Sequence, residues 1–364
     1  MRFVTGILPL LVFAPAGIYF MFVFRRFLRL FPAMSASPGM KVLGWVLAAA
    51  FGGAFILFSR SIWSTGIVVT LYFLLACLAL QIVHIFYKNQ TFYGLTWVIA
   101  GALTALVLLL GWWNMHTIHE KDYVVETTKL ERDVTVAFIS DLHLGLNMDA
   151  GKLGEYLDKI SAAKPDLLLL GGDIFDESTT KEDMEKACLL LGRVDAKYGV
   201  YYVYGNHDSG RYRAGRPYTE EEMTRSLTAA GVHVLADEKA DFDNGVTLIG
   251  LEDRSRRTAD RTAELLTDRS RYNIVLDHQP VDLQEKADAG ADLDLSGHTH
   301  GGQVWPLGIF NEYWSTNDYN YGLRTYGDMT SIVSSGIAGW GYSVRTQKQC
   351  EYLMITIRVL REGG

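Results

Sequence analysis

The distribution of charge divides this chain more sharply than any other feature of its sequence. Up to His119 there is no aspartate or glutamate and there are seven lysines and arginines, whereas all 41 acidic residues follow. So strong an asymmetry within one sequence indicates two different environments rather than one uniform globule. It also excludes a simple basic protein that binds nucleic acid, because such a protein carries an excess of positive charge on its binding domain.

Four long apolar runs without an internal charge fill the acid-free part, at residues 3–24, 42–58, 66–87 and 93–113. Each run is about 20 residues long, which is the length that a helix needs to cross roughly 30 Å of hydrocarbon. Buried helices of water-soluble proteins usually keep a polar stripe, and here Gln81 and His84 are nearly the only strongly polar side chains. We therefore predict that residues 1–113 form a transmembrane region of four helices that spans the lipid bilayer.

The first run also has the outline of a cleaved signal peptide. Arg2 precedes it, and Ala14-Pro15-Ala16 imitates a cleavage site. The run stays apolar as far as Phe24, however, and ends at the pair Arg25-Arg26. We therefore interpret it as a membrane anchor that remains in the protein.

The positive charges of the short loops predict how these helices are oriented, because lysine and arginine are retained on the cytoplasmic side. Five of them follow the first and third runs, and two lie on the opposite side: Arg25, Arg26, Arg29, Lys41 and Lys88 against Arg2 and Arg60. This bias places the amino terminus outside the cytoplasm. The domain that follows Trp113 is then extracytoplasmic, in a multi-pass integral membrane protein.

The rest of the chain, residues 122–364, has the pattern of a layered α/β domain. Short β-branched or apolar runs at 134–140, 166–170, 200–204, 246–251, 273–276 and 352–359 are typical of strands. Helical stretches at 152–163 and 181–191 lie between the first three runs. Strands that alternate with helices predict an α/β domain large enough for one core, joined to the first part by residues 114–129.

Polar residues follow five of the predicted strands at the point where each strand ends. They form the blocks Asp141-Leu142-His143, Gly171-Gly172-Asp173, Gly205-Asn206-His207-Asp208, Asp277-His278 and Gly297-His298-Thr299-His300-Gly301. Each block alone is also typical of an ordinary turn, but their ordered recurrence favours a functional site. Because ligands of α/β sheets bind beyond the carboxyl ends of strands, we expect these side chains to meet in one crevice.

The residue types in these blocks predict the chemistry of that site. Imidazole, carboxylate and amide ligands without thiolates suit a pair of borderline divalent metal ions. Two such ions about 4 Å apart would lower the pKa of a bridging water and hold a phosphoryl group between them. The sequence therefore predicts hydrolysis of a phosphate ester.

These blocks resemble, in the same order, those of the calcineurin-like metallophosphoesterases. The resemblance rests on Asp141-x-His143, Gly172-Asp173-x-x-Asp176, Gly205-Asn206-His207-Asp208, His278 and Gly297-His298-x-His300, and it covers essentially the whole second part. The apolar region before them is similar to the membrane-anchored bacterial branch of that family. The resemblance implies a layered β-sandwich flanked by helices, and two divalent ions for which manganese is expected and iron or zinc are alternatives.

The resemblance also implies a role for each polar residue. One metal ion would be held by Asp141, His143, Asp173 and His300, and the other by Asp173, Asn206, His278 and His298, with Asp173 bridging the two. His207 would donate a proton to the leaving oxygen or stabilise its charge, oriented by Asp176. An imidazole beside a carboxylate is a suitable acid near neutral pH. Asp208 is an alternative to Asp176 for the orienting role.

One departure from the family pattern concerns the substrate. Protein phosphatases of this family follow the second block with an arginine that binds phosphate, whereas here Glu177 and Ser178 follow Asp176. A protein substrate is therefore not expected. Three other arginines are candidates for binding phosphate, although a solvated surface position is favoured for each: Arg211, Arg213 and Arg254.

The segment after the last block is rich in aromatic residues. They are Trp305, Phe310, Tyr313, Trp314, Tyr319, Tyr321, Trp340 and Tyr342. Packing in the core is the favoured interpretation. The alternative is an apolar entry for a lipid-linked phosphate, since aromatic rings also favour the membrane interface.

Together these observations predict a membrane-anchored, metal-dependent phosphoesterase. We expect it to hydrolyse a phosphodiester or pyrophosphate bond through a metal-bridged hydroxide, and a lipid-linked phosphate is one expected substrate. Two alternatives remain. One is a UDP-2,3-diacylglucosamine pyrophosphatase of lipid A synthesis, which would need a cytoplasmic active site, and the other is a catalytically silent sensor of a phosphate ligand.

Overall fold

The chain divides into two compact units, as a computed structural model of the protein describes them. One unit comprises residues 1–113 with 341–344, and the other comprises residues 114–340 with 345–364. The structure describes residues 2–58, 65–209, 212, 216–257 and 261–361, and the side chains of residues 2–13 and 311 lie outside this description.

The first unit consists of long apolar helices: α1 (Arg2–Leu28), α2 (Pro38–Phe58), α3 (Thr65–Phe86) and α4 (Gln90–His116), of which α4 runs on into the second unit. Among the described residues, α2, α3 and α4 are long and apolar enough to cross a membrane. This is one candidate span fewer than the sequence predicted, and α1 is the helix whose first side chains are not described. Within the unit, the rings of Phe20, Phe55 and Phe73 pack edge-on or stacked against one another.

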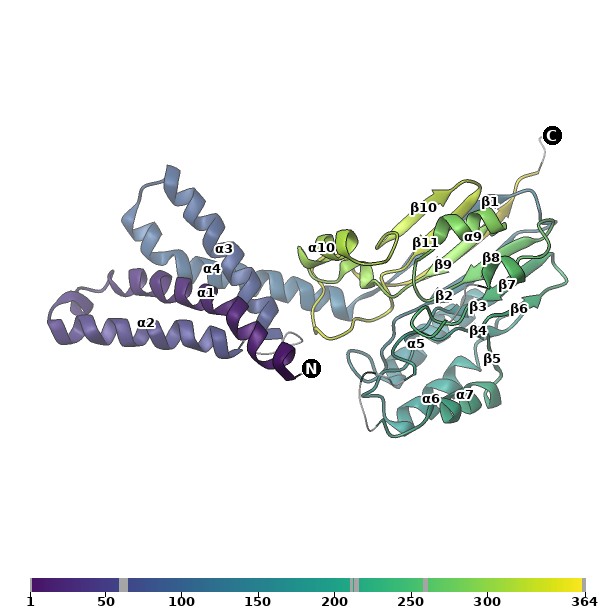
Figure 1. Cartoon of the computed structure of the whole chain (residues 1–364), viewed down its shortest axis with the longest axis horizontal. Coiled ribbons are helices and arrows are strands. Elements are labelled where there is room, and N and C mark those ends of the chain that lie inside the picture. Colours follow the sequence, from purple (N-terminus) through teal and green to yellow (C-terminus); the bar gives the residue numbers. More distant parts are fainter. Residues whose placement is uncertain (1, 59–64, 210–211, 213–215, 258–260, 362–364) are drawn as a thin grey trace. The chain divides into compact units, whose positions relative to one another are not determined.

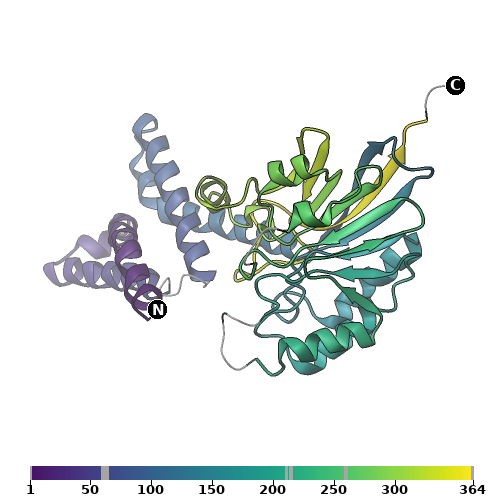
Figure 2. The ribbon, with the colours of Figure 1, turned by 45° about the vertical axis from the view of Figure 1, so that its right-hand side comes forward.

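The second unit is a sandwich of two six-stranded sheets (Figures 1 and 2). The first sheet has the order β1-β12-β2-β3-β4-β5, and the second has the order β10-β11-β9-β8-β7-β6. The first sheet contains β1 (Ile118–Thr127), β2 (Val134–Ile139), β3 (Leu167–Leu170), β4 (Val200–Tyr202), β5 (Val232–Val234) and β12 (Cys350–Val359). The second contains β6 (Glu238–Asp241), β7 (Val246–Gly250), β8 (Tyr272–Leu276), β9 (Leu293–Ser296), β10 (Gly322–Tyr326) and β11 (Met329–Val333). The α/β sandwich predicted from the sequence is confirmed.

Helices cover the outer faces of both sheets (Figure 1). The first sheet carries α5 (Ala150–Ala163), α6 (Lys181–Leu191) and α7 (Glu220–Ala229), while α9 (Leu283–Ala289) covers the second. The helix predicted at 181–191 is confirmed, and the one predicted at 152–163 begins two residues earlier. It does so because the Asp149 side chain accepts a hydrogen bond of 2.8 Å from the backbone N–H of Lys152, which caps the first turn.

Alternation along β2 explains how the sequence builds these layers. Val134, Val136 and Phe138 point into the core between the two sheets, whereas Ala137 and Ile139 point into the core under the helices. Successive side chains of a strand point to opposite faces, so a strand that is buried on both faces is apolar throughout. Burying each such side chain contributes roughly 1.5–3 kcal/mol, and this strand carries the first polar block at its end.

Strand β1 differs from the sequence prediction, which treated residues 114–129 as a connection. It pairs in parallel with β12 over its whole length, from Ile118 opposite Cys350 to Thr127 opposite Val359. As an edge strand it keeps many polar side chains exposed, including those of His119, Glu120 and Asp122. Charged side chains on an edge strand limit pairing with other chains. Because polar residues dominate the first half of β1, its sequence lacks the apolar pattern by which a strand is predicted.

Candidate metal centre

The seven predicted metal ligands all lie in segments that directly follow strands of the second unit, six on loops and His300 at the start of a short 3-10 helix (His300–Gly302). Asp141 and His143 follow β2, Asp173 follows β3, and Asn206 follows β4, all in the first sheet. The other ligands come from the second sheet, with His278 after β8 and His298 and His300 after β9. The strand ends of two stacked sheets therefore form the crevice, rather than the edge of a single sheet.

Around His278 the structure brings together the four donor atoms predicted for one metal ion. The Nε2 atom of His278 lies 3.2 Å from Oδ2 of Asp173, 3.0 Å from Oδ1 of Asn206 and 3.2 Å from Nδ1 of His298. The other ring nitrogen of His278, Nδ1, donates a hydrogen bond of 2.8 Å to the carbonyl oxygen of Gly171. In the neutral imidazole this leaves a lone pair on Nε2, directed at the oxygen acceptors of Asp173 and Asn206.

The second group of predicted ligands surrounds His143. Its Nε2 atom lies 3.3 Å from Nε2 of His300 and 3.6 Å from Oδ2 of Asp173, and Nε2 of His300 lies 3.8 Å from Oδ1 of Asp141. Asp141 also accepts hydrogen bonds of 2.9 and 3.0 Å from the backbone N–H of His298. The same hydrogen-bonded loop therefore joins the two groups.

Asp173 occupies the position between the two groups. Its Oδ2 atom is 3.6 Å from Nε2 of His143 and 3.2 Å from Nε2 of His278, and its Oδ1 atom accepts a hydrogen bond of 2.8 Å from the backbone N–H of His207. One carboxylate oxygen thus faces both sets of donor atoms, which is the geometry of a bridging ligand. Burial opposes ionisation of Asp173, but the surrounding histidines, His278 first, lower the pKa of its carboxyl well below the usual range.

The electrostatics of the site favour a positive charge at its centre. Burial alone would lower the pKa of His278, but the Asp173 carboxylate raises that pKa well above its usual value. By contrast, burial and the neighbouring His278 lower the pKa of His298 to about 4. The neutral imidazole is the form that binds a metal ion.

The backbone at these positions adopts an unfavourable conformation. Five of the seven candidate ligands have a positive φ: Asp141 (55°), His143 (42°), Asp173 (50°), His298 (68°) and His300 (50°). Residues other than glycine rarely adopt this region, which costs of order 1–3 kcal/mol per residue and is found mostly at functional sites. Contacts with the surrounding sheets must therefore stabilise the backbone of these five residues in this conformation.

Two glycines allow the ligand loops to approach each other closely. A Cβ atom on Gly205 would lie 2.2 Å from Oδ1 of Asp173, and one on Gly297 would lie 2.2 Å from Oδ2 of Asp141. Neither distance is compatible with a side chain larger than hydrogen. The glycines that the sequence places beside the ligands therefore have a steric role in the site.

His207 lies at the edge of the site with Glu177 as its nearest carboxylate. Its Nδ1 atom is 2.9 Å from Oε2 of Glu177, compared with 3.8 Å from Oδ2 of Asp176. Burial alone would lower the pKa of His207, but the hydrogen bond to Glu177 and the nearby carboxylate of Asp173 raise it above the usual value. Glu177 is not among the site residues predicted from the sequence, where it stands out only because protein phosphatases of the family have an arginine after the second block. Its position directly after Asp176 is the one signal in the sequence that could have identified it.

Asp176, the predicted orienting partner of His207, lies between two histidines. Its Oδ2 atom is 3.4 Å from Nδ1 of His143 and 3.8 Å from Nδ1 of His207. Burial opposes its charge, but the adjacent ring of His143 and a hydrogen bond of 2.9 Å from the backbone N–H of Ser178 lower the pKa of this carboxyl to about 2. Asp176 is therefore an anion that contacts a candidate ligand and a candidate acid together.

Asp208, the alternative orienting residue, is turned into the protein. Its Oδ2 atom accepts hydrogen bonds of 2.7 Å from the backbone N–H groups of Asp173 and Gly205, and its Oδ1 atom accepts one of 2.9 Å from Phe175. Burial, and then the charge of Asp173, raise the pKa of Asp208 to about 6. Its contacts fix the loops after β3 and β4 against each other and leave the orientation of His207 to Glu177 and Asp176.

Buried ion pairs and hydrogen bonds fix the backbone next to the metal ligands of the second sheet. Lys286 is fully buried, with Nζ 3.0 Å from Asp277 and 2.8 Å from Asp294, and Arg257 lies 2.8 Å from Asp277. Asp277 directly precedes His278, so this network fixes the end of β8. The guanidinium of Arg345, also buried, donates a hydrogen bond of 2.7 Å to the backbone carbonyl of His300.

Of the three arginines predicted as candidates for phosphate binding, the structure describes only Arg254. Arg254 forms an ion pair with Asp282 and is largely exposed, in agreement with the surface position favoured from the sequence. Arg211 and Arg213 lie outside the described residues.

The aromatic segment after the last block is only partly in the core. Tyr319 is fully buried, but Trp305, Phe310, Tyr313 and Trp314 are exposed by 47%, 47%, 80% and 79%. The prediction of core packing is therefore wrong for these four residues. The last three lie on the short helix α10 (Leu307–Trp314), which leaves all three rings largely exposed.

Comparison with known proteins identifies the domain that carries this site. Residues 134–302 match the calcineurin-like phosphoesterase family. The second unit therefore contains a calcineurin-like phosphoesterase domain at residues 134–302. In the chain this domain follows a region in which three of the described helices are long and apolar enough to cross a membrane.

Several relatives share this domain. An uncharacterized metallophosphoesterase of Campylobacter jejuni is 28% identical over 251 residues, which is 67% of this chain and 64% of the relative. One from Helicobacter pylori (strain 26695) is 29% identical, covering 62% of this chain and 60% of the relative. A transmembrane protein with a metallophosphoesterase domain from Bos taurus is 24% identical, covering 61% and 52%. The chain thus matches between about half and two thirds of the length of these relatives.

Proposed function

We propose that this protein is a membrane-anchored phosphoesterase that uses two divalent metal ions to hydrolyse a phosphodiester or pyrophosphate bond. The observation that carries the proposal is the convergence of both donor groups on Oδ2 of Asp173, which lies 3.6 Å from His143 and 3.2 Å from His278. Without a metal ion, the raised pKa of His278 places a proton among these atoms, and a divalent cation that replaced it would meet the same carboxylate, amide and imidazole donors. The family match of the domain supports the same reaction class.

The donor atoms suit a pair of metal ions. Asp141, His143, Asp173 and His300 would hold one, and Asp173, Asn206, His278 and His298 the other, with nitrogen and oxygen donors that manganese, iron and zinc accept. The hydrogen bond from Nδ1 of His278 to Gly171 fixes the tautomer that presents a lone pair to the site. When bound, two such ions would lower the pKa of a water molecule and hold the phosphoryl group.

His207 is the group that we assign to the leaving oxygen. Because its Nδ1 is held by Glu177 at 2.9 Å, the ring presents Nε2 away from that carboxylate. The raised pKa of His207 favours the protonated ring near neutral pH, and a protonated Nε2 can give its proton to an alkoxide or phosphate that departs. The rings of Trp340 and Tyr212 lie 5.0 and 4.8 Å from the His207 ring and limit the directions from which water approaches it.

Substitution of the two neighbouring carboxylates should separate metal binding from proton transfer. Asp176→Asn is expected to weaken metal binding by about 10- to 100-fold, because Asp176 contacts the candidate ligand His143. Glu177→Gln should instead lower kcat by about tenfold or more and leave metal affinity unchanged. Metal affinity measured against a competing chelator, together with kcat, tests this, with Glu185→Gln on the exposed face of α6 as the control. Equal loss of metal affinity in both variants would contradict the division of roles.

The membrane context supports a substrate at or near the bilayer. Among the described residues, three helices are long and apolar enough to cross a membrane, and the exposed rings of Phe310, Tyr313 and Trp314 are of the kind that favours a membrane interface. We therefore propose a lipid-linked phosphate as the substrate class. The loop charges support an extracytoplasmic domain, which labelling of an Asp122→Cys variant in intact cells with an impermeant thiol reagent would reveal; protection until lysis would contradict it.

Removal of the exposed rings should affect a lipid substrate and spare a soluble one. In proteoliposomes, Trp305→Ala and Trp314→Ala are each expected to raise KM for a p-nitrophenyl ester of phosphatidic acid by about tenfold, which corresponds to about 1.4 kcal/mol of lost apolar burial. The rate with bis-p-nitrophenyl phosphate should be unchanged. Leu189→Ala, at an apolar residue on α6 that is 55% exposed, is the control. Unchanged KM for the lipid ester in both tryptophan variants would remove the support for a lipid-linked substrate.

The reaction class itself is tested by hydrolysis of bis-p-nitrophenyl phosphate by the purified protein. Activity should disappear when a chelator removes divalent ions and return when manganese is added, because the proposed nucleophile depends on the ions. If chelation left the rate unchanged, or if no divalent ion supported hydrolysis, the two-metal reaction would be wrong for this protein.

A further inference from the structure

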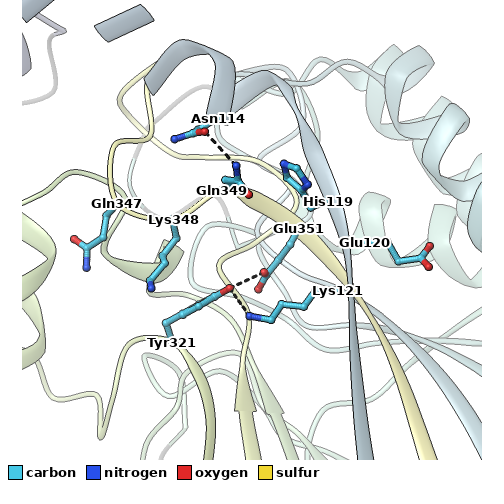
Figure 3. Close-up of a pocket in the computed structure, with 9 residues that line it drawn as sticks. All are labelled: Asn114, His119, Glu120, Lys121, Tyr321, Gln347, Lys348, Gln349 and Glu351. Carbon is cyan, nitrogen blue, oxygen red and sulfur yellow. Dashed lines mark hydrogen bonds between the residues drawn. The ribbon is translucent and has the colours of Figure 1, made fainter. Parts of the chain in front are cut away.

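The first unit has no acidic side chain with which to neutralise its own positive charges. Neither residues 1–113 nor residues 341–344 contain an aspartate or glutamate, whereas the same unit carries seven lysines and arginines. In the second unit, by contrast, the hydroxyl of Tyr321 joins Lys121 to the carboxylate of Glu351 (Figure 3). A buried cation of the first unit therefore has no carboxylate of that unit as a counter-ion.

Arg25 is the cation for which this lack matters most. Its side chain is only 5% exposed, and its Nε and Nη1 atoms are enclosed without a hydrogen-bond partner among the described residues. The guanidinium lies against α2, with Cζ 5.4 Å from the centre of the Trp45 ring, and a Cβ atom on Gly44 would lie 3.2 Å from that Cζ. The remaining nitrogen, Nη2, is not enclosed, so an acceptor from outside can reach it. A buried charge is costly unless an opposite charge or acceptors compensate it.

Two close contacts define the register of α1 against α2. The helices lie side by side and antiparallel, as Figure 1 shows, and a Cβ atom on Gly52 would lie 2.2 Å from the carbonyl oxygen of Gly17. Arg25 follows Gly17 by eight residues on α1, and Gly44 precedes Gly52 by eight residues on α2. Because both helices rise by the same length per residue, the register is unchanged between the two contacts.

This register brings two more cations to the level of Arg25. Arg29 follows Arg25 by four residues, and the backbone N–H of Arg29 still donates a hydrogen bond of 3.2 Å to the carbonyl oxygen of Arg26. Lys41 precedes Gly44 by three residues. Residues three or four apart are neighbours on a helix, so both cations lie one turn from the Arg25–Gly44 contact, toward the loop that joins the helices. Both side chains are exposed.

Exposed rings continue from these cations toward the middle of the helices. Phe22 on α1 and Trp45 on α2 are exposed by 44% and 40%, and their rings meet edge to face with centres 5.8 Å apart. Phe22 precedes Arg25 by three residues, which is about 4.5 Å along the helix axis. Since α2 is long and apolar enough to cross a membrane, these rings lie on the hydrocarbon side of the cations. This order, cations and then apolar rings, matches the phosphate and the acyl chains of a phospholipid.

We propose that Arg25, Arg29 and Lys41 bind the phosphate of an anionic phospholipid whose acyl chains lie along Phe22 and Trp45. The planar guanidinium of an arginine presents N–H groups that suit phosphate oxygens. The loop charges predict that this end of the helices is cytoplasmic, the side on which the membrane surface is negative. The site lies entirely in the first unit, so it does not depend on the reaction proposed for the metal centre.

Amine labelling tests the site on the unaltered protein, because the first unit has only two lysines. Lys41 belongs to the proposed site, and Lys88, which is exposed in another loop, is the control. The full-length protein in a nonionic detergent is acetylated with and without dioctanoyl phosphatidylglycerol, and the extent at each lysine is read by peptide mass spectrometry. At about ten times the dissociation constant of the lipid, labelling of Lys41 should slow by about tenfold, because only the unbound fraction reacts. Labelling of Lys88 should not change.

Two further probes show which part of the lipid is recognised. Protection of Lys41 by phosphatidylglycerol, and not by dioctanoylglycerol or by inorganic phosphate at the same concentration, supports the proposal. Equal protection by dioctanoylglycerol, which has no phosphate, would show that acyl chains alone cover the lysine. Equal protection by inorganic phosphate would show that no lipid is required. Either result would overturn the proposal, as would the absence of protection by phosphatidylglycerol.

Glutamine variants provide the second measurement, with bound phosphatidylglycerol counted by native mass spectrometry. Arg25→Gln should weaken binding by about tenfold, the size expected when one charge-assisted hydrogen bond is lost. Arg29→Gln, at an exposed position, should also weaken binding, and it decides the question if thermal unfolding shows that Arg25→Gln does not fold. Lys88→Gln removes one positive charge elsewhere in the unit and should have no effect. Equal weakening in Lys88→Gln, or unchanged binding in the folded arginine variants, would overturn the assignment.

Discussion

Replacement of Asp173 by asparagine is expected to abolish phosphodiester hydrolysis almost completely. Its Oδ2 atom faces both groups of ligands, at 3.6 Å from His143 and 3.2 Å from His278, so the neutral amide removes the shared negative charge from both. A loss of several kcal/mol of charge stabilisation corresponds to a fall in kcat of order 10³-fold. The measurement is the initial rate with bis-p-nitrophenyl phosphate at saturating manganese.

The matched control is Asp158→Asn, which makes the same chemical change on the exposed face of α5. Thermal unfolding of both variants distinguishes a chemical effect from a loss of fold, because Asp173 is buried and Asp158 is not. A folded Asp173→Asn protein that retained more than about a tenth of the activity would contradict the bridging role.

Replacement of His207 by alanine should lower kcat by about 10²- to 10⁴-fold and leave the bound metal unchanged. The expectation follows from its contacts: Nδ1 is held by Glu177 at 2.9 Å, and the predicted ligands do not include this ring. The loss should grow with the pKa of the leaving group, because a poor leaving oxygen needs the proton more. A series of aryl phosphodiesters with phenols of increasing pKa measures this trend.

His233→Ala is the matched control, since His233 is an exposed histidine on β5 that stacks on Tyr201 of the neighbouring strand β4. It should leave kcat unchanged for every ester. A constant loss for all leaving groups in His207→Ala would indicate that His207 positions the substrate or the metal ligands instead of donating a proton.

Much of the domain could be predicted because its central strands are buried on both faces. The apolar runs at β2, β3, β4 and β8 stand out from their surroundings, and a polar site residue follows each of them within four residues. The strand-end rule then places those residues together without any knowledge of the pairing. It does not reveal that the strands belong to two sheets, because sheet membership depends on long-range partners such as β9 beside β11.

The parts that the sequence did not reveal depend on tertiary contacts. Strand β1 is a polar edge strand whose register is set by β12, more than 200 residues away in the chain. The contact of Glu177 with His207 depends on the loop after β3, where Thr179 accepts a hydrogen bond of 2.8 Å from the backbone N–H of Asp176. Neither contact has a periodic signal in the sequence.

The burial of the aromatic segment also could not be predicted from its sequence. Composition favoured burial for all its rings, and burial holds for Tyr319, whose hydroxyl donates a hydrogen bond of 3.0 Å to Ser331. Tyr313 and Trp314 are instead exposed, and they are the last two residues of α10. Aromatic content alone does not distinguish a core from a surface that meets lipid.

The most direct test of the two-metal site is a titration of the metal-stripped, full-length protein with manganese. The bound ions per chain and the rate with bis-p-nitrophenyl phosphate are measured at each addition. We predict that activity rises until two ions are bound per chain, and that Asp173→Asn binds fewer ions and stays inactive. Full activity with one ion per chain, or activity that persists in the stripped protein, would contradict a site in which Asp173 joins two metal ions.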